Sequence, residues 1–244
     1  MHSIHQILIR KLREHSRLCT HDLAEIKSFS HTERTLEPNE DFIRQGDVPN
    51  VSALVISGMV ARYHLLKDGR RQYLSFHMAG DLPDSQALFV EEMDHAVCAI
   101  GNAVVASIPH AELIPAFNRC PTLGFAIWRE TLIDAAIFRE AVTNNSARAM
   151  PERMAHLFSE IFYRSMSSGL TESGTCPFPI SLIQLGETLG MAIATVNRTL
   201  SQLRETGAVD LHNGDLDVKN WKRLSALGQF NPLYLHLKKP PQVN

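Results

Sequence analysis

Two periods of hydrophobic residues divide this chain of 244 residues. From Arg34 to Ala111, short apolar runs alternate with polar positions, which is the two-residue period of a strand. Glycines separate these runs every eleven or twelve residues, at Gly46, Gly58, Gly69 and Gly80. Turns at such regular spacing are typical of a small antiparallel β-sandwich or jelly roll. Asn39 falls where a further turn is needed, and residues 67–69 are expected to form a hairpin tip.

Helical periodicity flanks this β region. Residues 3–28 predict one or two helices packed outside the larger domain. After Pro121, apolar residues recur on two faces, one with Phe125, Trp128, Leu132, Ala135 and Val142, the other with Leu123, Ile127, Ile133, Ile137 and Ala141. One face can cover the sandwich, and the other predicts a partner helix, most simply its copy in a two-fold dimer. Burial of the whole helix within one subunit is the alternative.

Pro151 predicts a break in this long helix. Because the residue before a proline disfavours helical geometry, the helix should end between Thr143 and Met150. A second helix should then begin with Pro151 in its first turn. Such a break is a natural hinge between domains.

The stretch of residues 180–204 has the spacing of a helix-turn-helix. Gly186 can supply the close contact between helices and Gly190 the corner with positive φ, while Ser181 and Gln184 can form a capping box. The facing sides are apolar, with Leu185, Leu189, Val196, Leu200 and Leu203. The second helix, expected over residues 193–204, should expose the surface that a recognition helix offers to a major groove, with Ile193, Ala194, Asn197, Arg198 and Ser201.

Residues 207–218 distinguish a DNA-binding module from an ordinary helical hairpin in a protein core. Asn213-Gly214 lies between two short alternating runs, which is the strongest short-range signal for a β-hairpin. A helix-turn-helix followed by a two-stranded hairpin is a winged helix. This combination favours DNA binding.

The overall charge gives no basic signature. The formal net charge is −2 and the sequence pI is about 6.6, so attraction to phosphates has to come from local placement of cations. In the winged segment the cations are offset by acids, with Arg198, Arg204, Lys219, Lys222 and Arg223 against Glu187, Glu205, Asp210, Asp215 and Asp217.

The cysteines and histidines do not form metal or disulfide motifs. Cys19, Cys98, Cys120 and Cys176 are scattered without a CxxC pair, which argues against a disulfide framework, a zinc knuckle or an iron–sulfur cluster. No HxH or HExxH spacing occurs, so no metal site is predicted. Free thiols, no signal-peptide layout and no apolar run of membrane-spanning length predict a cytoplasmic protein outside the membrane.

The chain resembles the CRP/FNR family of bacterial transcription regulators over residues 20–225. The resemblance lies in LEPNEDFIRQGDVPNVSALVISGMVARYHLLKDGRRQYLSFHMAGDL, in the long helix, and in GETLGMAIATVNRTLSQLRETGAV. It implies an α+β fold with an N-terminal cyclic-nucleotide-binding-like β-roll (a jelly roll), a long central dimerisation helix and a C-terminal winged helix-turn-helix. The expected domains are the N-terminal helices and β-roll effector domain (1–118), the dimerisation helix and hinge (119–149) and the DNA-binding domain (150–244). The resemblance further implies a homodimer, not an enzyme, that binds palindromic double-stranded DNA and contacts RNA polymerase.

Departures from the family pattern concern the effector. Where cyclic AMP-binding members carry Gly-Glu and Arg-Ser pairs, this sequence has Asp84-Ser85 and His95-Ala96, and Phe138-Arg139 stands where those members place polar residues that touch the base. A neutral histidine and an added aspartate suit an anion poorly, so no tight binding of cyclic AMP is expected. The cysteine cluster of iron–sulfur members is absent and no haem ligands are identified. The effector is thus unknown or absent, and the pocket-side candidates are Asp84, Ser85, Gln86, His95 and Arg139.

The DNA-reading helix departs from the family as well. Ile193-Ala194 replaces an Arg-Glu pair, and Arg198 keeps the place of a base-reading arginine. Arg198 can fork to guanine O6 and N7, Ile193 can touch a thymine methyl group, and the remaining candidate contacts are Thr195, Asn197 and Ser201. Ala192 occupies the N-cap position and forgoes roughly 1 kcal/mol that a Ser or Thr cap provides.

Two other functions are compatible with the residues alone. A ligand-sensing adaptor that does not bind DNA agrees with the small number of unbalanced cations. A cupin-type metalloenzyme shares the jelly roll, but His64, His77 and His95 lack the spacing of its ligands.

Overall fold

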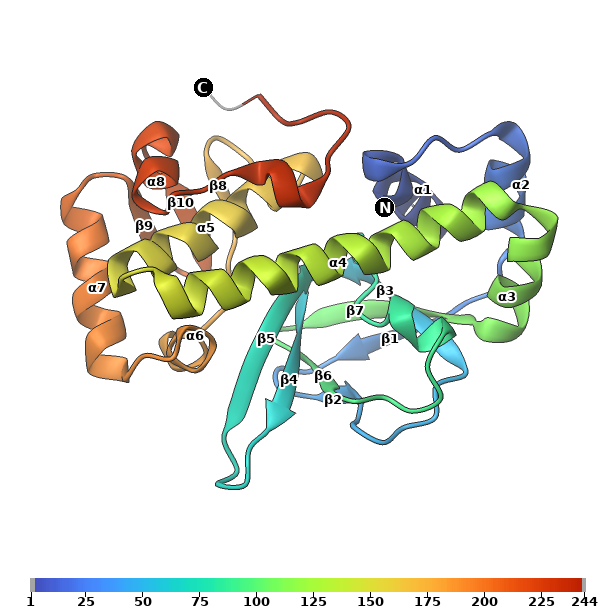
Figure 1. Ribbon diagram of the computed structural model, residues 1–244, viewed down its shortest axis with the longest axis horizontal. Helices are drawn as coiled ribbons and strands as arrows, with labels where there is room; N and C mark the ends of the chain where they lie inside the picture. The colour runs from blue at the N-terminus through green and yellow to red at the C-terminus, as the bar shows by residue number, and fades with distance from the viewer. Residues whose placement is uncertain (1–2, 243–244) are drawn as a thin grey trace. The chain divides into compact units, whose positions relative to one another are not determined.

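The computed structural model describes residues 3–242 and divides into two compact units. The first unit ends at Ala135 and omits residues 71–73, which group with the second unit, formed by the residues after Ala135. The division falls within α4 (Pro121–Ala147), which is one continuous helix (Figure 1). The three-part division at residues 118 and 149 stays a prediction.

The first unit is built on two antiparallel sheets, as the two-residue period predicts. One sheet has the order β1-β7-β3, with β1 (Thr32–Leu36), β3 (Val51–Ser57) and β7 (Ala103–Pro109). The other has the order β2-β6-β4-β5, with β2 (Asp41–Ile43), β4 (Met59–Leu65), β5 (Arg71–Met78) and β6 (Ala96–Ala99). Small aliphatic residues from both sheets form a common core, with Leu36, Val55, Val60, Val97, Ala99, Ala103 and Val105. This is the expected β-roll.

The predicted turns of the β-roll are confirmed by the backbone. Asn39 has φ 65°, the left-handed conformation that the turn needs. Gly69 has φ 84° at the tip between β4 and β5. Gly58 is required for space as well, because a Cβ there would lie 2.3 Å from the Asn102 carbonyl oxygen.

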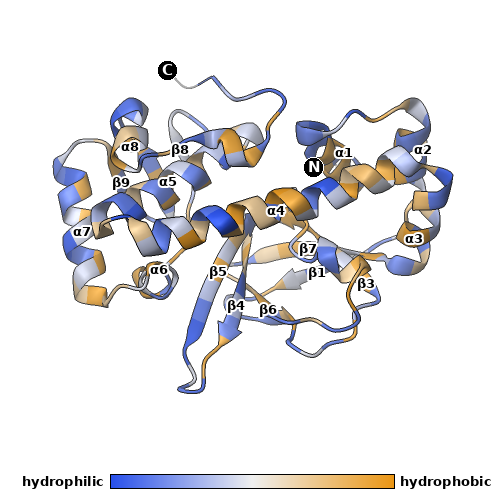
Figure 2. Cartoon of the chain, in the orientation of Figure 1, coloured by the Kyte–Doolittle hydropathy of each residue, from blue (hydrophilic) through white to orange (hydrophobic). Residues whose placement is uncertain are grey.

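Helices cover one side of the β-roll. They are α1 (Ile4–His15), α2 (Thr20–Ser28), α3 (His110–Arg119) and the start of α4, with the short 3₁₀ turn η1 (Ser85–Leu88) between β5 and β6. A second apolar cluster joins Leu8 and Leu12 of α1 to Leu54 of β3 and to Leu123 and Ile127 of α4. Apolar residues lie both on the buried side of α4, with Leu123 and Ile127, and on its exposed side, with Phe125 and Trp128, and Figure 2 shows orange segments along its first half. The two N-terminal helices and the long helix are therefore confirmed.

The second unit is a winged helix. Its elements after α4 are α5 (Met150–Ser167), β8 (Thr175–Pro177), α6 (Leu182–Leu189), α7 (Ile193–Glu205), β9 (Val209–His212), β10 (Asp215–Val218), α8 (Trp221–Leu227) and η2 (Pro232–Leu235). The strands form a sheet in the order β8-β10-β9. The helical break occurs at residues 148–149, and Pro151 lies in the first turn of α5, as predicted. None of the helices within residues 3–242 is long and apolar enough to cross a membrane.

Candidate nucleic-acid interface and effector pocket

Local capping and two glycines set the geometry of the helix-turn-helix. The Ser181 hydroxyl accepts a hydrogen bond from the Gln184 amide at 3.2 Å, and the Gln184 side chain accepts one from the Ser181 amide at 2.8 Å. Gly190 ends α6 with φ 65° and ψ 40°. A Cβ on Gly186 would lie 2.6 Å from the Met191 carbonyl oxygen, so only glycine allows this approach. The predicted cap, corner and helix contact are all present.

The α6–α7 packing turns one face of α7 outward. The predicted facing residues are buried, namely Leu185, Leu189, Val196, Leu200 and Leu203. The predicted outer residues are exposed, namely Ile193, Ala194, Asn197, Arg198 and Ser201, while Thr195 is half-buried. Ala192 begins the helix without a side-chain cap, as expected. Four of the five candidate DNA contacts thus share the exposed face of α7, whereas Thr195 lies at its edge.

Arg198 is the unpaired cation of this face. Within the described residues 3–242, its guanidinium has no hydrogen bond or ion pair. Arg204, six residues further along, is instead held by the wing, because its Nε donates to Asp210 Oδ1 at 2.6 Å and its Nη2 to the Leu211 carbonyl oxygen at 2.6 Å. The hydrogen bond from Arg204 lowers the pKa of Asp210. Of these two arginines, Arg198 is the one whose guanidinium has no internal partner within residues 3–242.

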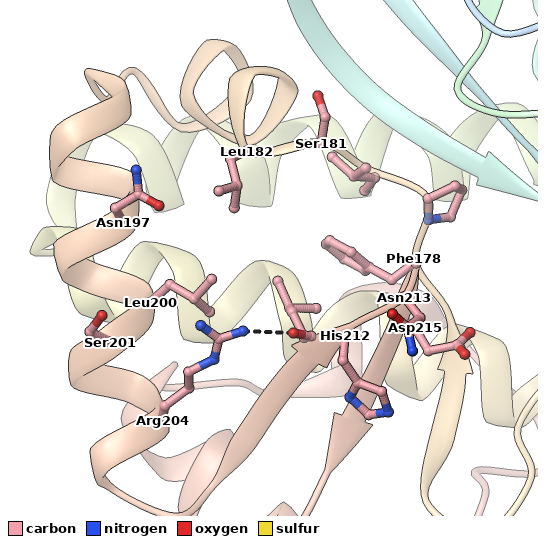
Figure 3. Close-up of a pocket in the computed structure, with 14 residues that line it drawn as sticks. Phe178, Ser181, Leu182, Asn197, Leu200, Ser201, Arg204, His212, Asn213 and Asp215 are labelled. Atoms are coloured by element: carbon pink, nitrogen blue, oxygen red, sulfur yellow. Dashed lines mark hydrogen bonds between the residues drawn. The ribbon is translucent and has the colours of Figure 1, made fainter.

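A groove separates α7 from the wing (Figure 3). One wall carries Asn197, Leu200, Ser201 and Arg204 of α7, and the wing contributes Leu211, His212, Asn213, Gly214 and Asp215. The hairpin turn has φ 53° at Asn213 and φ 82° at Gly214, both in the left-handed region, as the Asn-Gly signal predicts. Asp215 places a negative charge at this groove, which further weakens the basic character of the interface.

The effector-pocket candidates Asp84 and Ser85 are buried at the start of η1. Asp84 Oδ1 accepts a hydrogen bond of 2.8 Å from the Ala53 amide of β3. Burial raises the pKa of Asp84 to about 7. This carboxyl group therefore fastens the segment before η1 to the sheet.

Gln86 and His95 contact each other near these two residues. His95 Nδ1 donates to Asp94 Oδ1 at 2.6 Å, and Gln86 Nε2 lies 3.3 Å from His95 Nε2. Burial, with a further contribution from the Arg62 charge, lowers the pKa of His95. A neutral His95 that donates through Nδ1 and accepts through Nε2 satisfies both contacts. The fifth candidate, Arg139, lies in the second unit and is exposed.

Arg62 is the charged residue of this region that the sequence analysis missed. It lies in β4 with 1% of its surface exposed. Its Nε donates to the Pro83 carbonyl oxygen at 2.6 Å and its Nη2 to Gln86 Oε1 at 3.1 Å, and it forms an ion pair with Asp134 of α4. The available signal was an arginine in the middle of the otherwise apolar run MVARY.

Metal-binding residues are not gathered in the described part of the chain. Within residues 3–242, no group of three or more His, Cys, Asp or Glu side chains could hold a metal ion. The four cysteines are free thiols, with Cys19 exposed and the others buried.

Two family models match the two halves of this arrangement. Residues 33–120 match the cyclic nucleotide-binding domain, and residues 152–227 match the Crp-like helix-turn-helix domain. The chain belongs to the CRP/FNR family. It is a DNA-binding transcription regulator of the CRP/FNR type, and because the family consists of regulators rather than enzymes, the cupin alternative is set aside.

Related CRP/FNR proteins cover most of the chain. The nitrogen fixation regulation protein FixK of Bradyrhizobium diazoefficiens is 26% identical over 209 residues, which are 84% of this chain and 86% of that protein. The fumarate and nitrate reduction regulatory protein of Salmonella typhimurium is 21% identical over 211 residues, 85% of this chain and 82% of that protein. The structure of FixK2 from Bradyrhizobium japonicum superposes with a TM-score of 0.71 at 26% identity, covering 81% of this chain and 97% of that chain. The predicted fold class is confirmed.

Proposed function

We propose that this CRP/FNR-type regulator acts as a homodimer that reads a palindromic double-stranded DNA site through α7 and adjusts transcription by contact with RNA polymerase. The observation that carries the proposal is Arg198, which is exposed and unpaired on the outer face of α7 within the described residues. A guanidinium without an internal partner is available for the bidentate contact to guanine O6 and N7. The other proposed DNA contacts are Ile193, Thr195, Asn197 and Ser201.

The apolar side of α4 supports the homodimer. Phe125 is 61% exposed, Trp128 49% and Leu132 49%, and all three belong to the first unit. We call these three residues the α4 seam. Their spacing of three and four residues puts them on one helix face, and a large exposed apolar face marks an interaction surface. The same face of a second copy fits it by symmetry, with residues 119–149 serving as the dimerisation helix.

We propose no particular effector for the β-roll, which binds either an unknown effector or none. Its candidate residues are Asp84, Ser85, Gln86, His95 and Arg139. Asp84 and His95 are already engaged, since Asp84 accepts from Ala53 and His95 pairs with Asp94. We expect no tight binding of cyclic AMP and no iron–sulfur or haem cofactor. A DNA target in a bacterium agrees with a cytoplasmic location.

The proposal is tested by selecting genomic DNA fragments that bind the full-length protein. The expected result is a motif with two-fold symmetry, retained by a protein that light scattering shows to be a dimer. Repeating the selection at two salt concentrations separates specific from non-specific binding, since phosphate contacts weaken steeply with salt. A motif without symmetry, or a monomer at the DNA-binding concentration, would overturn the homodimer.

A further inference from the structure

Arg62 and Asp134 form a buried link between the β-roll and α4. The Arg62 guanidinium contacts three segments at once: Pro83 before η1, Gln86 within η1, and Asp134 on α4. The side chain of Arg62 is 2% exposed and that of Asp134 is 19% exposed. A planar fork with three fixed partners has strict directional requirements, unlike an aliphatic contact.

A second acidic residue of α4 points to the same side of the helix. Glu130 precedes Asp134 by one turn, is buried, and lies 3.7 Å from the Lys11 ammonium group of α1. Lys11 is also 2.9 Å from Asp81, which follows β5. Two carboxylates one turn apart therefore face two cations of the first unit.

Helix geometry relates these carboxylates to the α4 seam. With 3.6 residues per turn, Glu130 and Asp134 lie on the face roughly opposite to Phe125, Trp128 and Leu132. The exposed fractions of the side chains agree with this geometry, because the two acids are turned inward and the three seam residues outward. Any rotation of α4 that withdraws Asp134 from Arg62 also turns the seam away from solvent.

Apolar packing alone does not define this rotation. The contacts of α4 with the β-roll include small and aliphatic residues such as Leu123, Ala126 and Ile127, and hydrophobic attraction is non-directional. A buried ion pair adds little net stability compared with an apolar pair of similar volume, but its directionality can select one register. The Arg62–Asp134 pair is buried and directional, so it can select one rotation of α4.

We propose that the Arg62–Asp134 ion pair fixes the rotation of α4 on the β-roll, so that the α4 seam faces a second copy of this chain without a bound small molecule. Arg62 and Asp134 are then positioning residues, which act through the seam. The inference rests on the proposed homodimer. It agrees with the hydrogen bonds that Asp84, Gln86 and His95 already make within the chain.

The decisive variant replaces the pair by apolar residues of similar size, Arg62→Met with Asp134→Leu. This change removes the directional contact together with both charges of the pair, so the chain is expected to fold. Sedimentation should show a dimer dissociation constant raised at least about tenfold for a subunit that circular dichroism shows to be folded. A merely structural role predicts a lower melting temperature with unchanged dimerisation of the folded protein.

Three further variants keep the test informative. Asp134→Glu retains the carboxylate and should dimerise within about threefold of the wild type, whereas Asp134→Asn should not. Arg34→Gln, which removes the exposed pair with Glu40 in the same unit, is the matched control and should leave dimerisation unchanged. Wild-type dimerisation by the apolar double variant, or by Asp134→Asn, would overturn the inference alone. A wild-type protein that is monomeric would overturn the homodimer as well.

Discussion

Gly228 lies directly against the backbone of His156, at the point where the segment after α8 meets α5. A Cβ on Gly228 would be 2.6 Å from the His156 amide nitrogen. The Gly228 carbonyl oxygen accepts a hydrogen bond of 2.9 Å from His156 Nδ1. Further along, the Tyr234 hydroxyl donates to Glu160 Oε2 at 2.8 Å, which fastens η2 to the same helix. The absent side chain at residue 228 thus permits the docking of the whole C-terminal segment.

Gly228→Ala should destabilise the winged unit by about 1–3 kcal/mol, because the added methyl group forces a backbone shift in a packed region. The free energy of unfolding can be followed by the fluorescence of Trp221, which stacks on Tyr163, in a Trp128→Phe background that leaves one tryptophan. Ala226→Ser, on the exposed side of α8, is the control and should unfold like the parent. Equal stability of the alanine variant would show that the contact relaxes at no cost.

Locally determined features were predictable from the sequence. The Ser181–Gln184 capping box, the corner at Gly190 and the Asn213-Gly214 turn each depend on residues a few positions apart. Their backbone preferences operate without tertiary context, which is why the winged helix and its exposed face were predicted correctly. The end of α4 before Pro151 belongs to the same group.

Contacts between distant segments were not predictable. Arg62 and Asp134 are 72 positions apart, and no periodicity in either segment marks them as partners. The Arg204–Asp210 pair is closer in sequence but depends on how the wing folds back on α7. Sequence composition showed that charges nearly balance in this unit, whereas only the structure shows which arginine is engaged and which is unpaired.

Arg198→Ala should weaken specific DNA binding by about 1–3 kcal/mol, because a bidentate contact to guanine is lost. The preference for guanine at the contacted position should relax, while melting temperature and dimerisation remain unchanged. Fluorescence anisotropy with the selected site and with a variant lacking that guanine measures both effects. Arg13→Ala, an exposed arginine of α1, removes the same charge and is the matched control. Equal losses in both variants would indicate a general charge effect.

Asp210→Asn should increase DNA affinity in a way that does not depend on sequence. The substitution removes one negative charge from the wing and releases Arg204 from its ion pair, so that the guanidinium can reach a phosphate. The slope of log affinity against log salt should become steeper by about one unit for one added phosphate contact. Glu92→Gln, in an exposed loop of the β-roll, changes the net charge equally and should leave the slope unchanged. A steeper slope in both variants would contradict a local role for Asp210.

Glu130→Gln should flatten the pH dependence of stability. Burial raises the pKa of Glu130 to about 7, whereas an unfolded glutamate titrates near about 4.3. Because the folded pKa is the higher one, the stabilising contribution is complete below about pH 4 and is lost as the pH rises to about 7. The variant should therefore gain stability relative to the wild type by about 1 kcal/mol per pH unit across this window. Lys11 keeps its ion pairs with Asp81 and Glu14, so its ammonium group is not left unpaired. Denaturant unfolding of both proteins from pH 4 to pH 8, with Glu91→Gln as the exposed control, measures the difference, and a constant offset between variant and wild type would contradict the raised pKa.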